Sequence, residues 1–113
     1  MHKAGRRWSV HDRYGNGIYI TQERWEHIID ETNHPEIEAY EEYLTRTLRT
    51  GRRTQDPLNP HKYRYVAFFD DLPDPVNTLV AIVLFEVEVD ESGHAFPNNY
   101  VATTFFKHIR QKR

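Results

Sequence analysis

One long apolar run dominates the hydrophobic pattern of this chain. It extends from Thr78 to Val89, has the sequence TLVAIVLFEVEV, and begins with seven consecutive apolar residues, Leu79–Phe85. β-Branched residues within it favour extended backbone, and the alternation of Glu and Val that follows is typical of a strand with an exposed face. The pattern predicts the central strand of an antiparallel sheet, covered on both faces in its first half and on one face in its second half.

Shorter alternating segments on both sides of this run predict further strands. Tyr100–Phe106 follows a turn signal and is expected to run back beside the central strand. Near the start, Trp8–Val10 and Ile18–Ile20 are brief extended pieces separated by a glycine-rich turn signal. In the segment Lys62–Phe69, alternation assigns one set of residues to each face of a strand: Lys62, Arg64, Val66 and Phe68 to one, and Tyr63, Tyr65, Ala67 and Phe69 to the other.

Two helical segments are expected between these regions. The first covers about Gln22–Glu31, with Thr21 as its N-cap. The second begins at Pro35, which suits the first turn of a helix, and ends at Gly51. Apolar residues keep helical spacing in both segments: Trp25, Ile28 and Ile29, then Ile37, Tyr40, Leu44 and Leu48. The order of elements predicts an α+β fold, in which two N-terminal helices pack on a four-stranded antiparallel β-sheet meander.

Length and composition narrow the class of protein. The 113 residues are expected to form a single domain, residues 1–113. There is no cysteine, no visible signal peptide, and no run of the roughly 20 apolar residues that a membrane span needs. We therefore expect a cytoplasmic protein with no membrane partner.

The charge distribution is more informative than the net charge of −2, which alone argues against a nucleic-acid-binding protein. Basic residues gather in three places, and if these meet in space they form a surface that binds anions. The alternative is that they are ordinary solvated charges at the termini and a helix end. The three groups are Lys3, Arg6, Arg7 and Arg13; Arg46, Arg49, Arg52 and Arg53; and Lys107, Arg110, Lys112 and Arg113.

The motifs of several enzyme classes are missing from the sequence. It contains no His-x-x-x-His, no glycine-rich phosphate loop and no Gly-x-Ser-x-Gly turn, so we expect neither a metal site nor a cofactor. What remains is a set of His, Arg, Thr and Tyr residues, which suits metal-free phosphodiester cleavage. Histidine transfers protons near neutral pH, and arginine holds phosphate oxygens with a permanent charge.

Two histidines stand out by position. His27 lies on the flank of the first expected helix, and His34 lies at the joint between the helices. Each has a plain structural alternative, an exposed helix residue for His27 and a cap for His34. The aromatic residues of the strands have alternatives too, because RNA bases stack on exposed rings but strand alternation buries about half of them.

Several segments together resemble a known family. ITQERWEHI (Ile20–Ile28), HPE (His34–Glu36) and YLTRTL (Tyr43–Leu48) are similar to the phage-associated branch of the barnase/EndoU/colicin/RelE-like (BECR-fold) nucleases. The strand segments Lys62–Tyr65, Leu79–Phe85 and Ala102–Phe105 match this pattern more loosely. The resemblance covers roughly residues 18–109, which we expect to be the core of an RNase-like domain.

The resemblance implies a two-helix, four-stranded antiparallel fold and a metal-independent endoribonuclease that leaves a 2′,3′-cyclic phosphate. It also implies a toxin-like role, with an antitoxin or immunity protein as a possible partner. Position by position, the implied catalytic residues are His27 and His34 as acid and base, Arg64 as phosphate clamp, and Thr103 as a polar contributor. The expected substrate-binding residues are Arg24, Arg52, Arg53, Lys62 and Tyr65.

Two other functions remain open at this point. The near-neutral charge also fits a non-catalytic module on the same fold that binds RNA or another protein. An enzyme acting on a different phosphate-bearing substrate, such as a nucleotide, is the third alternative.

Overall fold

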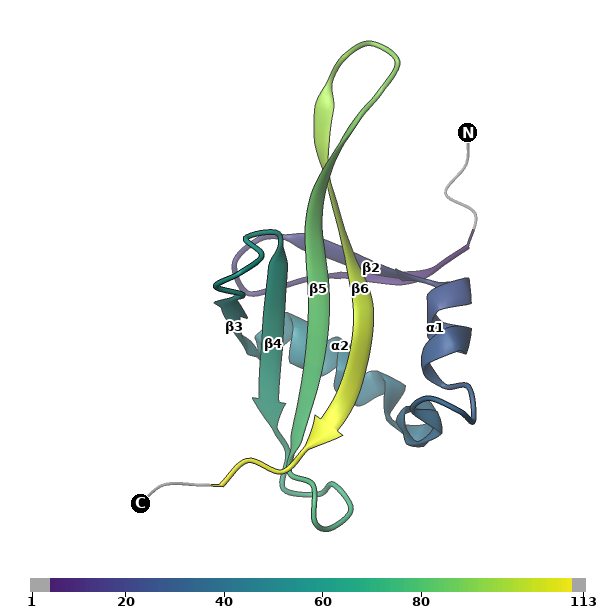
Figure 1. Ribbon diagram of the computed structural model, residues 1–113, viewed down its shortest axis with the longest axis vertical. Helices are drawn as coiled ribbons and strands as arrows, with labels where there is room; N and C mark the ends of the chain where they lie inside the picture. The colour runs from purple at the N-terminus through teal and green to yellow at the C-terminus, as the bar shows by residue number, and fades with distance from the viewer. Residues whose placement is uncertain (1–4, 111–113) are drawn as a thin grey trace.

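A curved sheet of six strands forms the framework of the protein (Figure 1). The computed structural model describes residues 5–110. The strand order is β1-β2-β6-β5-β4-β3, and neighbours are antiparallel except β2 and β6, which are parallel and pair at Tyr19 and Tyr100. In chain order the elements are β1 (Arg6–His11), β2 (Gly17–Thr21), α1 (Gln22–Ile28), the 3-10 helix η1 (Pro35–Tyr40), α2 (Glu41–Thr50), β3 (Arg52–Gln55), β4 (Lys62–Phe68), β5 (Thr78–Val89) and β6 (Ala95–Lys107).

The predicted fold, two N-terminal helices on a four-stranded antiparallel meander, is therefore wrong. Two strands precede the helices, and the sheet has six strands and mixed direction. Strand β3, RRTQ, was not expected, and the two brief extended pieces near the start belong to the sheet as β1, RRWSVH, and β2, GIYIT. Segments of this length contain little apolar periodicity, so pairing with the rest of the sheet decides their conformation.

Strand β5 has the bounds that the apolar run predicts, Thr78–Val89. Its first four residues are buried, but Val87 and Val89 near its end are 68% and 64% exposed. The paired residues 86–98 of β5 and β6 project beyond the rest of the protein as a two-stranded arm (Figure 1). The expectation that the second half of this strand is covered on one face is wrong, because the helices do not extend along the arm.

The helical segments lie between β2 and β3 and differ in detail from the prediction. α1 ends at Ile28, earlier than expected, because the Asp30 carboxylate accepts hydrogen bonds from the amide and hydroxyl of Thr32 and turns the chain. The second segment starts at Pro35 as a 3-10 helix and becomes α-helical only at Glu41. Among residues 5–110 no helix is long and apolar enough to cross a membrane.

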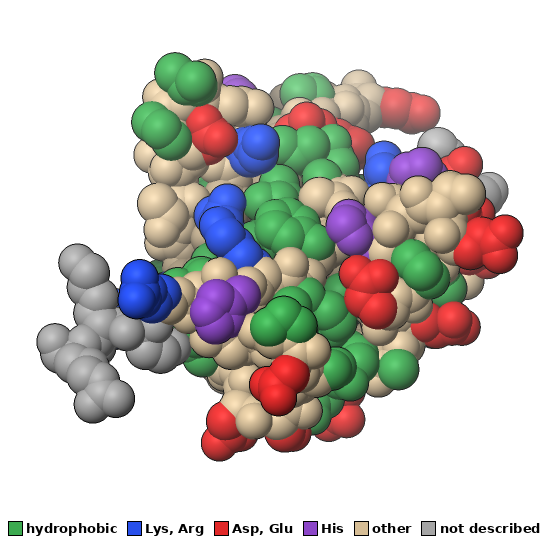
Figure 2. Space-filling view, turned by 60° about the horizontal axis from the view of Figure 1, so that its bottom comes forward, with side chains coloured by type: hydrophobic (Ala, Val, Ile, Leu, Met, Phe, Trp, Pro, Cys, Tyr) green, Lys and Arg blue, Asp and Glu red, His purple; other side chains and the backbone are tan. Residues whose placement is uncertain are grey.

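The two faces of the sheet differ as the alternation along β4 predicts. Tyr65 belongs to the buried core beneath the helices, so its neighbours Arg64 and Val66 stand on the opposite side, which we call the outer face. None of the described helices covers this face (Figure 1), and Figure 2 shows basic side chains and histidines flanking a strip of apolar side chains. Register assigns the following residues to the outer face: Arg52, Lys62, Arg64, Val66, Phe68, Thr78, Val80, Ile82, Leu84, Tyr100, Thr103, Phe105 and Lys107.

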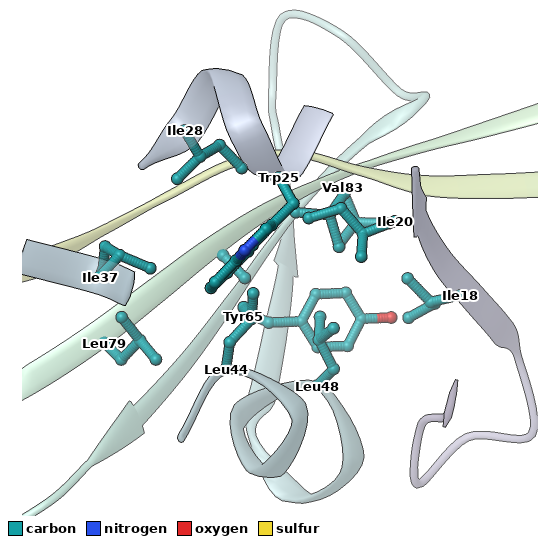
Figure 3. Close-up of a cluster of buried hydrophobic side chains, with 12 residues drawn as sticks. Ile18, Ile20, Trp25, Ile28, Ile37, Leu44, Leu48, Tyr65, Leu79 and Val83 are labelled. Atoms are coloured by element: carbon teal, nitrogen blue, oxygen red, sulfur yellow. The ribbon is translucent and has the colours of Figure 1, made fainter. Parts of the chain in front are cut away.

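The inner face of the sheet and the helices enclose the hydrophobic core (Figure 3). Trp25 of α1 lies over the sheet, and Leu44 and Leu48 of α2 pack from the other helix. The remaining fully buried members come from every layer: Ile18, Ile20, Ile28, Ile37, Tyr65, Leu79, Ala81, Val83 and Val101. The apolar helix faces predicted from the sequence thus supply much of the core.

Gly51 connects α2 to β3 at a point of close backbone approach. A Cβ at this position would overlap the carbonyl oxygen of Thr47 and lie 2.8 Å from that of Val66. Because both are backbone atoms, Gly51→Ala should lower the free energy of unfolding by about 2 kcal/mol, measured by urea denaturation. The exposed Arg49→Ala variant, in the same helical turn, should change it by less than about 0.5 kcal/mol. Equal unfolding free energies for the two variants would contradict the close approach.

Candidate functional site

Two of the predicted catalytic residues share a row across the outer face. Arg64 of β4 pairs with Ile82 of β5, and Ile82 pairs with Thr103 of β6. Residues in register on neighbouring strands stand on the same face, so Arg64 and Thr103 flank Ile82 with their Cα atoms about 10 Å apart. Both side chains are half-buried.

His34 lies at the margin of the outer face, beside β6. Its ring centroid is 6.2 Å from that of Phe105, and the two rings are inclined by 31°. Phe105 precedes Lys107 and follows Thr103 on the same face of β6, since alternate residues of a strand share a face. His34 therefore approaches the row that contains Arg64 and Thr103.

The position of His34 is set by contacts on its other side. Its backbone amide donates to the carbonyl of Ile28, 2.9 Å away, and its Nδ1 lies 3.5 Å from a carboxylate oxygen of Glu36. His34 occupies the N-cap position of η1, but its side chain makes no capping hydrogen bond and is 33% exposed. A carboxylate at Nδ1 leaves Nε2 as the ring nitrogen that can face a substrate.

His27 and Arg24 are exposed on α1 and line an open hollow together with Thr21 and Glu23. The hydroxyl of Thr21 accepts a 2.9 Å hydrogen bond from the Arg24 amide, which confirms Thr21 as the N-cap of this helix. Arg24 also borders a second hollow, against Tyr100 of β6. The structure thus places the two histidines on different segments, His34 beside the sheet and His27 on the exposed side of α1.

The predicted cations Arg52 and Lys62 are also on the outer face. Arg52 of β3 pairs with Val66, and Lys62 of β4 pairs with Leu84. The Lys62 Nζ lies 3.8 Å from a carboxylate oxygen of Asp56, an exposed ion pair of small energy. With Arg64 these residues give the β3–β4 side of the face a positive charge.

Among residues 5–110, the members of the three basic groups do not form one surface. Arg7 forms an ion pair with Glu41 on α2. The Arg46 guanidinium lies 5.2 Å from the ring centroid of Tyr43 and 5.0 Å from that of Phe69. Lys3, Lys112 and Arg113 lie outside the described residues. Within the described part of the chain, Arg52, Lys62, Arg64 and Lys107 give β3, β4 and β6 positive charge on the outer face, and Arg6 and Arg24 lie beside Tyr19 and Tyr100.

Tyr65 and Arg53 are not on the outer face, contrary to their expected role in substrate binding. Tyr65 is fully buried, and its hydroxyl donates a 2.5 Å hydrogen bond to Asp12. Arg53 pairs with Tyr65 in register and therefore points to the same side, where its guanidinium packs 4.5 Å from the Tyr63 ring centroid. In this structure neither is available to a ligand on the outer face.

Several residues beside the site were not among those predicted. Tyr19 of β2 pairs with Tyr100 of β6. Burial raises the pKa of the Tyr100 phenol, and the negative charge of Glu86 raises it further. Glu36, which faces His34, was part of the HPE motif without a role of its own. The signal for Tyr19 was present in Ile18-Tyr19-Ile20, because two buried isoleucines place the residue between them on the opposite face.

The chemistry available on the outer face is that of an imidazole, a guanidinium and a hydroxyl beside an apolar strip. The described residues contain no group of three or more His, Asp or Glu side chains placed to hold a metal ion. Comparisons with protein-family models, with curated proteins and with solved structures find no match to this chain.

Proposed function

We propose that this chain is a metal-independent endoribonuclease whose cleavage site is the outer face of the sheet. The observation that carries the proposal is the row of Arg64 and Thr103 across that face, with His34 at its margin against Phe105. Cleavage of RNA through its own 2′-hydroxyl needs proton transfer and stabilisation of negative charge on phosphorus. These three side chains are of the types that supply both.

In the proposed reaction, the 2′-oxygen attacks the adjacent phosphorus and the bond to the 5′-oxygen breaks. A base removes the proton of the 2′-hydroxyl, and an acid gives a proton to the departing 5′-oxygen, leaving a 2′,3′-cyclic phosphate and a 5′-hydroxyl. His34, oriented by Glu36, performs one of these transfers, and His27 is the candidate for the other. Arg64 binds the non-bridging oxygens as charge accumulates on them, and Thr103 donates a hydrogen bond.

We also propose that the chain is a member of the barnase/EndoU/colicin/RelE-like group, with a toxin-like role in the cytoplasm. The support for this part is the motif ERWEHI with HPE, whose residues include His27, His34 and Glu36. A protein partner that neutralises the nuclease would act most directly by covering the outer face and excluding RNA.

A second candidate function is a non-catalytic module that binds another protein. It is favoured by the arm, residues 86–98, where Val87 and Val89 are exposed beyond the body of the fold. Exposed apolar side chains on a projecting element are typical of interaction sites. A binding module of this kind would leave RNA intact under all conditions.

The test is incubation of the purified protein with single-stranded RNA in excess EDTA, followed by analysis of fragment ends. The wild type should cleave and leave 2′,3′-cyclic phosphates. Arg64→Ala should lower kcat/KM by about 100- to 1,000-fold, the usual effect of removing one charge-stabilising donor. Arg49→Ala, which removes the same charge from α2, should stay within about threefold of the wild type. A folded wild type that cleaves no RNA would remove the proposal in favour of the binding module.

A further inference from the structure

Two tyrosines from distant parts of the sequence meet on the outer face. Tyr19 of β2 and Tyr100 of β6 are paired across the parallel junction of the sheet, with ring centroids 6.1 Å apart and planes inclined by 44°. Tyr100 also pairs with Leu84, which stands two residues from Ile82 on the same face of β5. The tyrosine pair thus lies about 7 Å along the strands from the row of Arg64 and Thr103.

A hollow opens between these rings and helix α1. It is lined by Tyr19, Thr21, Arg24, Tyr100 and Val101. Arg24 is close enough for its positive charge to act on the Tyr100 phenol, where it partly opposes the rise in pKa. The hollow therefore combines aromatic rings with one exposed cation, as sites for single-stranded nucleic acid do.

The rings are fixed before any ligand binds. The Tyr19 hydroxyl donates a 2.7 Å hydrogen bond to the side-chain carbonyl of Asn98. The Tyr100 phenol lies close enough to the Glu86 carboxylate for that negative charge to help raise its pKa. The Arg6 guanidinium lies 3.8 Å from the Tyr19 ring centroid, so it already covers one face of this ring and holds it in place. Rings held in this way lose little conformational entropy on binding.

We infer that the hollow is a nucleotide subsite, in which Tyr100 stacks the base next to the scissile phosphate, Tyr19 forms the adjoining wall, and Arg24 binds that nucleotide's phosphate. This rests on the proposed function, since it places a nucleotide of a single-stranded RNA beside the cleavage row. Stacking on a ring is available to every base, so the subsite selects single-stranded over double-stranded RNA and does not select a base.

The experiment measures binding without cleavage. A short, fluorescently labelled 2′-O-methyl RNA has no free 2′-hydroxyl, so its affinity, read by fluorescence anisotropy, is independent of nuclease activity. Tyr100→Ala should weaken binding about 5- to 150-fold, the range for loss of one base stack, and Tyr100→Phe should stay within about twofold of the wild type. Arg24→Ala should reduce the magnitude of the slope of log affinity against log salt concentration by about one, the value for loss of one phosphate contact.

Tyr14→Ala is the matched control, because Tyr14 is an exposed tyrosine in the turn between β1 and β2. It should leave the affinity unchanged, and circular dichroism should show all variants folded. A series of probes of the same length carries one abasic nucleotide, each at a different position. For one of these probes, Tyr100→Ala should no longer weaken binding, because the base that stacks on Tyr100 is missing.

Each result bears on the inference separately from the proposed function. Equal affinities for Tyr100→Ala and Tyr14→Ala would overturn the subsite, and so would a loss in Tyr100→Phe as large as that in Tyr100→Ala. If Tyr100→Ala weakens binding while the wild type cleaves no RNA, the subsite stands and the nuclease proposal fails.

Discussion

His34→Ala should slow RNA cleavage by about 100-fold or more, the usual contribution of one acid or base in the transition state. His34 is partly exposed and makes no capping hydrogen bond, so the substitution should lower the free energy of unfolding by less than about 1 kcal/mol. The measurement is kcat/KM for a fluorogenic RNA, with thermal unfolding of the same samples. Loss of activity in a folded variant would identify His34 as part of the reaction and not of the fold.

The arm provides a matched control for this experiment. His94 has its Nδ1 3.6 Å from a carboxylate oxygen of Asp90, much like the 3.5 Å between His34 and Glu36, but it lies at the tip of the arm. His94→Ala should leave kcat/KM unchanged. Comparable losses for the two variants would mean that activity does not depend on the position of His34 beside the outer face.

The pH dependence separates proton transfer from simple binding. If His34 and a second group act as base and acid, kcat/KM of the wild type should follow a bell-shaped profile against pH, and His34→Ala should lose one limb. A profile with both limbs intact in His34→Ala would assign His34 to binding.

The part of the fold that the sequence predicts best is the part with the strongest burial. The bounds of β5 follow from its apolar run, and β4 ends within one residue of its predicted limit. The strand that was missed, β3, has little to bury: like β1, of which only Trp8–Val10 was expected, it is mostly exposed and lies at an edge of the sheet. Their place depends on pairing with residues far along the chain, which a local pattern does not contain.

Strand alternation, applied to every residue, would have predicted which of the candidate residues stand on the outer face. Tyr65 and Arg64 are adjacent in one strand, as are Arg53 and Arg52, so the members of each pair must face opposite sides. Tyr65 and Arg53 could have been excluded from the outer face on this ground alone. That Thr103 lies in register with Arg64 could not be predicted, because a bulge between Ile82 and Val83 shifts the pairing with β6.

Asp12→Ala should lower the free energy of unfolding by about 3 kcal/mol, a large share of the 5–15 kcal/mol typical of a domain. Asp12 is only 6% exposed and joins the β1–β2 hairpin to β4. One carboxylate oxygen accepts from the amides of Tyr14 and Asn16, and the other accepts from the Tyr65 hydroxyl and the Asn16 side chain. Alanine would leave the buried Tyr65 hydroxyl and two amides of the turn without this acceptor, so urea denaturation should show the loss.

The charge of Asp12 predicts how this loss depends on pH. Burial opposes ionisation, but the hydrogen bonds from Tyr65, Asn16 and Tyr14 outweigh it, so the pKa of the Asp12 carboxyl is lowered in the folded protein. A lowered pKa contributes stability that is present above the unfolded pKa of about 3.9 and is lost as pH falls through the folded value.

The comparison that isolates this contribution is between the wild type and Asp12→Asn, which keeps the shape of the side chain but does not titrate. Their difference in unfolding free energy should be constant between about pH 5 and 7 and should shrink below about pH 4, where the wild type loses the charge that asparagine never had. Tyr65→Phe removes the shortest hydrogen bond to the carboxylate, at a cost of about 1–2 kcal/mol. Because it raises the folded pKa and leaves the unfolded pKa unchanged, it should make that change smaller and complete it at a higher pH, with the same onset. A difference that stays the same at every pH would show that Asp12 acts only through the shape of the turn, and that its charge does not stabilise the junction between the hairpin and the sheet.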